Sequence, residues 1–297
     1  MMNLSLVDLH CDTVYELYAH HKSFEDPTLA IQLLRDCSDV YQSYLQVTAI
    51  WSDQHLSDEE AFRQCLRMLK WFHRDFLRSP NRLIPAVEDA RLLGGDLDRL
   101  EILYQNGVRF LTLLWKGCSC IGGAYDTDDG LTPFGKRVVS ACARLGIVAD
   151  ISHASIQSAY DTLEQAVGKP VIASHSDSFS VFPHPRNLTD ELFEQIRACY
   201  GLVGINLYQE HLGIGSLRGS AIDVILRHVD HFLSLGGEDI LCFGCDFDGA
   251  VTPSELRHPQ DLIAIAEEML CRGYSQTIIE KLFWKNAEAF IENNILI

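Results

Sequence analysis

Eight short apolar runs are spaced along the chain, and segments with the 3.6-residue periodicity of amphipathic helices lie between most of them. Polar residues bound each run, as expected for strands buried on both faces of a sheet. Strands that alternate with helices are typical of α/β proteins with a parallel sheet. The expected strands cover residues 4–10, 44–51, 82–88, 108–115, 146–153, 170–175, 201–208 and 239–246.

The expected helices fall between these runs or after them. Eight units of this kind fit a (β/α)8 TIM barrel, and a doubly wound sheet is the alternative. No glycine-rich G-x-G-x-x-G turn follows the first strand, which weakens the alternative. Because there is no linker, repeat or low-complexity stretch, we expect one domain over residues 1–297. The helices are expected at 57–77, 96–105, 133–145, 156–166, 190–199, 221–235, 260–272 and about 275–292.

The formal net charge of −17 argues against nucleic acid or an acidic membrane surface as a partner, since both are bound through Lys and Arg. No apolar run reaches the roughly 18 residues of a membrane span. The start of the chain lacks the basic and apolar regions of a signal peptide, and the ten Cys residues have no regular spacing. We therefore expect a cytoplasmic protein with reduced thiols.

Polar residues gather at the carboxyl ends of the expected strands, where barrel enzymes build their active sites. Three His residues and several carboxylates at one edge would be costly unless they were paired or bound to metal. The strand ends therefore predict a metal site. The residues concerned are His10, Asp12, Glu88, Trp115, His153, His175, Tyr208, Asp246 and Asp248.

His10 and Asp12 form an H-x-D pair, whose side chains project to the same side of an extended segment and suit one cation. Mixed nitrogen and oxygen donors favour zinc over magnesium or calcium. His153 and His175 offer a second, nitrogen-rich set, and Glu88 can bridge through its two oxygens. A binuclear zinc site is the interpretation that uses all five residues.

Six sequence motifs support a metal site, and through them the chain resembles the membrane (renal) dipeptidase family of zinc peptidases, in its bacterial branch. The resemblance covers essentially the whole chain and is most specific over residues 130–190. It implies a metallo-dipeptidase barrel that cleaves small dipeptides, with tolerance of a D-residue at the C-terminal position; family members are often homodimers. The motifs, in order, are DLHCDT, AVED, GLTPFGKRVV, VADISHAS, PVIASHSDSFSVFPHPRNLTDE and CFGCDFDG.

The resemblance also implies a role for each metal ligand. His10 and Asp12 would bind one Zn2+, and His153 and His175 the second. Glu88 would bridge the two ions together with a water or hydroxide, whose pKa the metals lower to near neutrality.

Further roles fall on residues around this centre. Arg186 would bind the carboxylate of the substrate through its planar fork, which restricts the enzyme to substrates that end at the next residue and favours a dipeptidase over an endopeptidase. Asp246 would carry the proton. Trp115 and Tyr208 are expected to line the substrate pocket. Trp115 stands where mammalian members have a His that helps to polarise the carbonyl, and Trp cannot act as an imidazole does.

Two other functions compete with a dipeptidase. The same metal centre could cleave an N-acyl amino acid, a cyclic amide or a lactam in a related binuclear-zinc amidohydrolase. Alternatively, a catalytically inactive barrel could bind a peptide or a protein. The complete set of ligands argues against the inactive barrel.

Several polar residues have structural interpretations. Asp248 is expected to bond the backbone of the DFDG turn. His184 could contact substrate or hold its loop, and the Gly- and Asp-rich segment 116–130 could be a lid or a passive loop. The remaining His residues are expected on the surface: His20, His21, His55, His73, His211, His228, His231 and His258.

Overall fold

Eight parallel strands form a single sheet in the computed structural model, which describes residues 4–24, 26, 31–33, 37–75 and 81–295. Their order in the sheet is β6-β5-β4-β3-β2-β1-β8-β7. The strands are β1 (Leu6–Asp8), β2 (Tyr44–Trp51), β3 (Arg82–Glu88), β4 (Phe110–Thr112), β5 (Val148–Asp150), β6 (Val171–Ile172), β7 (Val203–Ile205) and β8 (Leu241–Phe243).

The two outer strands of this order, β6 and β7, meet and close the sheet into a barrel. A parallel bridge joins Ala173 to Val203, and the Gly204 N–H donates to the Ala173 carbonyl at 2.9 Å. Gly204 is required at this seam because a Cβ there would lie 1.9 Å from the Ser174 carbonyl oxygen. The predicted TIM barrel is confirmed, and the doubly wound alternative is wrong.

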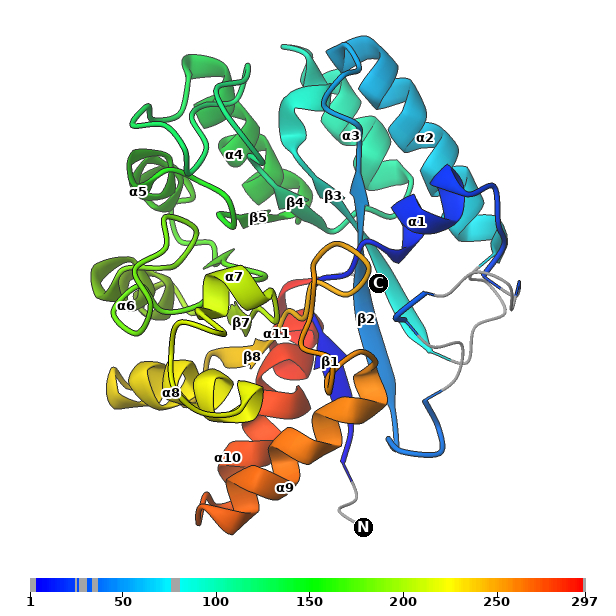
Figure 1. The fold of residues 1–297 in the computed structure, drawn as a ribbon. Coiled ribbons are helices and arrows are strands. Elements are labelled where there is room, and N and C mark those ends of the chain that lie inside the picture. Colours follow the sequence, from blue (N-terminus) through cyan, green and yellow to red (C-terminus); the bar gives the residue numbers. More distant parts are fainter. Residues whose placement is uncertain (1–3, 25, 27–30, 34–36, 76–80, 296–297) are drawn as a thin grey trace.

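Helices lie outside the ring of strands (Figure 1). The predicted helices are found within one or two residues at most ends, because their boundaries carry clear capping signals. Thr132, for example, accepts a hydrogen bond from Gly135 N at 3.0 Å, and Pro133 follows as the first helical residue. The main helices are α1 (Thr13–Ala19), α2 (Asp58–Asp75), α3 (Asp98–Gln105), α4 (Pro133–Leu145), α5 (Ile156–Gln165), α6 (Asp190–Ala198), α7 (Gln209–Leu212), α8 (Ala221–Ser234) and α9 (Ile263–Cys271).

The predicted C-terminal helix consists of α10 (Gln276–Glu280), a π-helical segment η4 (Lys281–Lys285) and α11 (Asn286–Asn294). Apolar side chains from the strands, including Val7, Leu45 and Phe110, fill the inside of the barrel. Phe290 and Ile291 of α11 join the same cluster. The C-terminal helix thus closes the amino-terminal mouth, and the site lies at the opposite edge.

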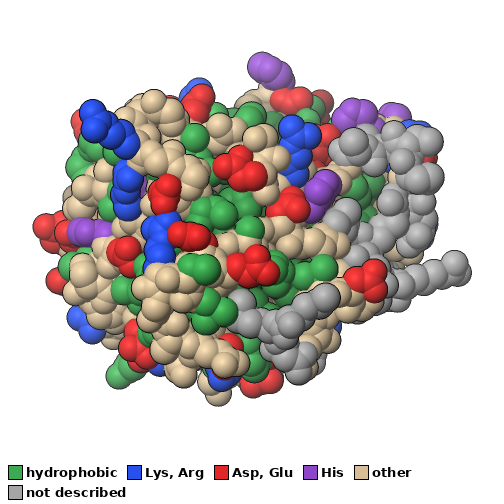
Figure 2. All heavy atoms as spheres, turned by 60° about the horizontal axis from the view of Figure 1, so that its bottom comes forward, with side chains coloured by type: hydrophobic (Ala, Val, Ile, Leu, Met, Phe, Trp, Pro, Cys, Tyr) green, Lys and Arg blue, Asp and Glu red, His purple; other side chains and the backbone are tan. Residues whose placement is uncertain are grey.

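Acidic side chains are spread over the face drawn in Figure 2, among basic and apolar ones. No helix of the described residues combines the length and the apolar character needed to cross a membrane.

None of the ten Cys residues, all of which lie in the described part of the chain, forms a disulfide bond. Cys242 packs inside the barrel and Cys245 in the outer core, as expected for positions that face opposite sides of a strand.

Candidate active site

The residues predicted from the strand ends meet just above the sheet. Glu88 is the last residue of β3, while five others stand three positions beyond the end of their strand. β2 and β3 have their expected bounds, whereas the other six strands are shorter than expected, because the chain leaves the hydrogen-bonded ladder before it presents these side chains. The five are Trp115, His153, His175, Tyr208 and Asp246.

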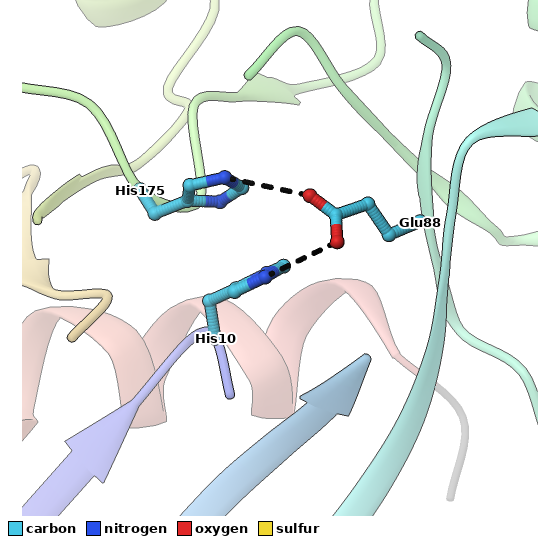
Figure 3. Close-up of side chains that lie close together, drawn as sticks. All are labelled: His10, Glu88 and His175. Atoms are coloured by element: carbon cyan, nitrogen blue, oxygen red, sulfur yellow. Dashed lines mark ion pairs between the residues drawn. The ribbon is translucent and has the colours of Figure 1, made fainter. Parts of the chain in front are cut away.

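Glu88 is buried between two His residues (Figure 3). Its Oε1 lies 3.6 Å from His175 Nε2, and its Oε2 lies 3.7 Å from His10 Nε2. Each carboxylate oxygen therefore faces a different imidazole, which is the arrangement that a bridging ligand requires.

His153 lies against the same carboxylate, with Nε2 at 3.0 Å from Glu88 Oε1. Its Nδ1 lies 3.1 Å from the Trp115 carbonyl oxygen. Because a carbonyl oxygen only accepts, the ring carries its hydrogen on Nδ1 and presents an unprotonated Nε2. Burial, with the charge of Arg186, lowers the pKa of His153 well below its usual range. His153 is thus prepared as a neutral ligand.

His175 is oriented in the same way through a hydroxyl. Ser174 donates to Asp150 Oδ2 at 2.6 Å, so its oxygen accepts from His175 Nδ1 at 2.7 Å. His175 Nε2 is left unprotonated, 3.0 Å from His153 Nε2. Two nitrogen lone pairs this close repel each other unless a cation lies between them, so this pair fits a metal ion.

Three carboxylates, one of which is Glu88 itself, surround His10. Their distances to His10 Nε2 are 3.6 Å for Asp12 Oδ2, 3.7 Å for Glu88 Oε2 and 3.9 Å for Asp246 Oδ1. Burial lowers the pKa of His10, but these negative charges outweigh burial and raise it to about 10. The buried His10 Nε2 and Asp12 Oδ1 have no hydrogen-bond partner among the described residues. This half of the site also favours a cation.

The donor set fits metal ions as well in its distances as in its chemistry. Two atoms bound to one zinc at about 2.0–2.2 Å and at the tetrahedral angle lie roughly 3.3–3.6 Å apart. Most of the separations above, from 3.0 to 3.7 Å, are close to that range. The donor atoms form two groups of three, and within each group the atoms lie no more than 4.8 Å apart. His10 belongs to both groups: one also contains Glu88 and His175, and the other Asp12 and Asp246.

Buried aspartates hold the loops that carry these ligands. Asp8 Oδ1 accepts from the backbone N–H groups of His10 at 3.2 Å and Cys245 at 2.9 Å, which ties the ends of β1 and β8 together. Asp150 Oδ1 accepts in the same manner from Ser152 and Ser174, each at 2.9 Å. Burial raises the pKa of Asp8 to about 6. These carboxylates position ligands through the backbone.

A pocket of about 500 Å³ opens above the metal ligands. Arg186 lines it and is only 5% exposed, yet it forms no ion pair with any residue that the structure describes. Its Nη2 donates to the His175 carbonyl at 3.4 Å, and its buried Nε has no partner among those residues. A buried guanidinium without a carboxylate partner is costly, so the pocket is built to receive an anion.

Eight residues named from the sequence line the pocket, together with several that were not expected there. The eight are Asp12, Glu88, Trp115, His153, Arg186, Tyr208, Asp246 and Asp248, although Asp248 was expected only to bond its turn. Tyr125 lies in the segment considered as a lid, and its ring is 5.8 Å from the Arg186 guanidinium carbon. Gln32 had no signal in the sequence. The other missed residues are Lys116, His211, Gly249, Ala250 and Val251.

Asp248 has a structural role, but its carboxylate bonds residues far away in the sequence and not, as predicted, the backbone of its own turn. It accepts hydrogen bonds from the Thr13 hydroxyl and from the backbone of Gln32 at 2.6 Å. Its own N–H donates to Gln32 Oε1 at 2.7 Å. The β8 loop is thereby joined to residues 31–33 at the edge of the pocket.

Two of the His residues expected on the surface are not there. His211 lines the pocket and packs edge-on against Tyr208, with ring centroids 4.6 Å apart. His228 is fully buried on α8, where Nδ1 accepts from Ser178 N at 3.0 Å and Nε2 donates to the Leu212 carbonyl at 3.1 Å. Surface assignment from helical periodicity failed at His228 because hydrogen bonds to both ring nitrogens offset the cost of burial.

His228 should make the stability of the fold depend on pH. Burial lowers its pKa from 6.5 to about 4. Below pH 6.5, His228 therefore binds a proton in the unfolded chain but not in the folded chain, and the free energy of unfolding falls as the pH drops towards 4. Between pH 7 and about pH 4.5 wild type should lose about 2–3 kcal/mol more than His228→Asn, measured by urea unfolding. An equal loss in both proteins would show that His228 does not couple folding to protons.

Comparison with known proteins identifies the family of this chain. The sequence model of the membrane dipeptidase family, peptidase family M19, matches residues 81–292. A Klebsiella pneumoniae protein described as an uncharacterized protein in the pqqA 5' region is 31% identical over 71% of this chain and 81% of its own length. Dipeptidase aclJ of Aspergillus oryzae is 28% identical over 68% of this chain, which spans only half of that longer protein.

Two solved structures superpose over nearly the whole chain. One is the metallopeptidase dipeptidase AC of family M19, with 26% identity, a TM-score of 0.89 and 99% of each chain covered. The other is a Rhodobacter sphaeroides metallopeptidase that holds a phosphinate mimic of the dipeptide L-Ala-D-Ala, with 25% identity, a TM-score of 0.87 and coverage of 99% and 100%. The chain belongs to the membrane dipeptidase family, peptidase family M19, and is a hydrolase of the metallo-dipeptidase class.

Proposed function

We propose that this chain hydrolyses small dipeptides at a centre of two zinc ions. His10 and Asp12 would hold one ion and His153 and His175 the other, with Glu88 shared between them. The convergence of these donors, the unprotonated Nε2 atoms of His153 and His175, and the His10 Nε2 without a hydrogen-bond partner among the described residues support this assignment. When bound, the ions would lower the pKa of water and polarise the scissile carbonyl group.

The observation that carries the choice of substrate is the unpaired Arg186. A free α-carboxylate is the anion that its planar fork matches, and a substrate anchored there has no room for further residues on that side. The reacting bond must then lie between Arg186 and the metal ligands. A bond one residue from a free carboxyl terminus is the last bond of a peptide, and in a dipeptide, the substrate class of the family to which the chain belongs, it is the only peptide bond.

Asp246 lies on the same pocket wall and is suited to move the proton. Burial raises the pKa of its carboxyl above the usual value, which makes the carboxylate a better proton acceptor. In the reaction the oxygen of water bonds to the carbonyl carbon and the C–N bond breaks. Asp246 would take the proton from the water and deliver it to the leaving nitrogen.

We further propose that dipeptides of the L-Xaa-D-Xaa type are among the substrates. The related Rhodobacter sphaeroides structure holds a mimic of L-Ala-D-Ala, and it superposes on this chain over almost its full length. Trp115 and Tyr208 line the same pocket as Arg186 and would contact the side chains of such a substrate.

Metal content and activity should rise and fall together. We expect purified protein to contain two zinc ions per chain by elemental analysis and to release amino acids from a panel of L-Xaa-L-Xaa and L-Xaa-D-Xaa dipeptides. Chelation should abolish release, and added zinc should restore it. Circular dichroism before and after chelation controls for unfolding. Absence of amine release from every dipeptide, with two zinc ions confirmed as bound, would exclude the proposed activity.

A further inference from the structure

The Asp246 carboxylate is held on one side only. Its Oδ1 points towards the metal ligands, 3.9 Å from His10 Nε2. Its Oδ2 accepts a hydrogen bond from Asn206 Nδ2 at 3.3 Å, and Asn206 is its only side-chain donor among the described residues. The orientation of a group that must exchange protons therefore depends on one amide.

That amide is itself fixed. Asn206 is fully buried and directly follows β7. Its Oδ1 accepts from Tyr208 N at 2.7 Å, and a backbone N–H can only donate, so the NH2 group must face Asp246. The backbone N–H of Asn206 donates to the buried Asp177 Oδ1 at 3.3 Å. The amide cannot turn over without losing the bond to Tyr208.

A neutral donor is what this position requires. Asp12, Glu88 and Asp246 already place three carboxylates around His10. A fourth carboxylate would repel Asp246, whereas a cation in this place would compete with the metal ions for it. An amide holds one oxygen of Asp246 without changing the charge of the site, and it leaves the other oxygen free.

We propose that Asn206 is a positioning residue for proton transfer, an inference that rests on the proposed function. By holding Oδ2 of Asp246, it keeps Oδ1 directed at the reacting atoms. The proton that leaves the attacking water then resides on Asp246 until the C–N bond breaks and the leaving nitrogen takes it.

Asn206→Asp is the sharpest test because it keeps the size of the side chain and the oxygen that accepts from Tyr208 N. It exchanges the NH2 donor for an acceptor oxygen and places a negative charge beside Asp246. We expect kcat for a dipeptide to fall about 10- to 100-fold, since positioned acid–base groups contribute on that scale. KM should stay within about threefold, because Arg186 still binds the carboxylate. Zinc content should remain at the wild-type value.

A thioester analogue of the dipeptide separates proton delivery from general damage. Its leaving thiolate needs no proton, so Asn206→Asp should slow the thioester much less than the amide. Equal losses on both substrates, a loss confined to KM, or a loss of zinc would each overturn the proposal. If Asn206→Asp does not fold, Asn206→Ser removes the amide with a smaller side chain, and its rates on the amide and the thioester can be compared in the same way.

Asn286 provides the matched control. It is also buried, and its Nδ2 donates to the carbonyl groups of Glu238 and Leu241 at 2.9 and 2.8 Å, at the opposite end of the barrel. Asn286→Asp should lower the free energy of unfolding and leave kcat unchanged. The wild-type protein in the same assay tests the proposed function separately: if it cleaves neither substrate, the dipeptidase assignment fails, whatever Asn206 does.

Discussion

Gly249→Ala is expected to lower kcat/KM for dipeptides by about 100-fold or more, because displacement of reacting groups by about 1 Å has effects of that size. Gly249 stands in the β8 loop at the floor of the pocket. A Cβ at this position would lie 1.9 Å from Asp12 Oδ2 and 2.6 Å from Asp246 Oδ1. One methyl group would therefore push away a proposed metal ligand and the proposed proton carrier together.

The effect should appear in metal binding as well as in rate. Zinc content by elemental analysis should fall, while the free energy of unfolding of the metal-free protein changes little. Gly273→Ala is the control: its φ of 87° strains an alanine, but nothing lies within 4 Å of the added Cβ. That variant should lose about 1 kcal/mol of stability and keep full activity. Full zinc content and activity in Gly249→Ala would mean that the loop moves freely.

Arg186→Met should raise KM for dipeptides about 30- to 1000-fold, which corresponds to about 2–4 kcal/mol of lost binding. The substitution removes the buried cation and keeps much of its apolar volume. The carboxylate of the substrate would then enter a buried pocket without a partner, at the cost of its desolvation. Steady-state kinetics on one good dipeptide measures the change.

Dipeptide amides turn this into a specific test of the carboxylate contact. They lack the negative charge, so wild type should discriminate strongly against them and Arg186→Met should not. Arg186→Lys keeps a cation without the planar fork and should give an intermediate KM. If Arg186→Met retains the wild-type preference for a free carboxylate, Arg186 does not bind that group and another substrate pose applies.

The barrel and the converging ligands were predictable from the sequence because most of the apolar runs end in a polar residue on the same edge. His10, Glu88 and His175 come from β1, β3 and β6, and parallel strands bring such ends together whatever lies between them. The capping residues Thr132 and Pro133 gave the start of α4 in the same local way.

The remaining parts of the site depend on contacts that no local pattern encodes. Gln32 is held at the pocket by hydrogen bonds to residues far along the chain, such as Asp248 and Thr252. Asn206 was hidden inside an apolar run that was expected to continue as strand to residue 208, whereas β7 ends at Ile205. The need for glycine at Gly249 follows from the closeness of Asp12, which is visible only in three dimensions.

The helix that closes the lower end of the barrel also determines how substrate enters the site and how the products leave it. With Phe290 and Ile291 of α11 packed into the interior, the described residues leave no passage downwards from the pocket. Substrate therefore enters, and both amino acids leave, through the opening at the top. Each free amino acid therefore occupies the route that the next dipeptide must take. Product inhibition that is competitive with the dipeptide follows from the way the barrel is sealed.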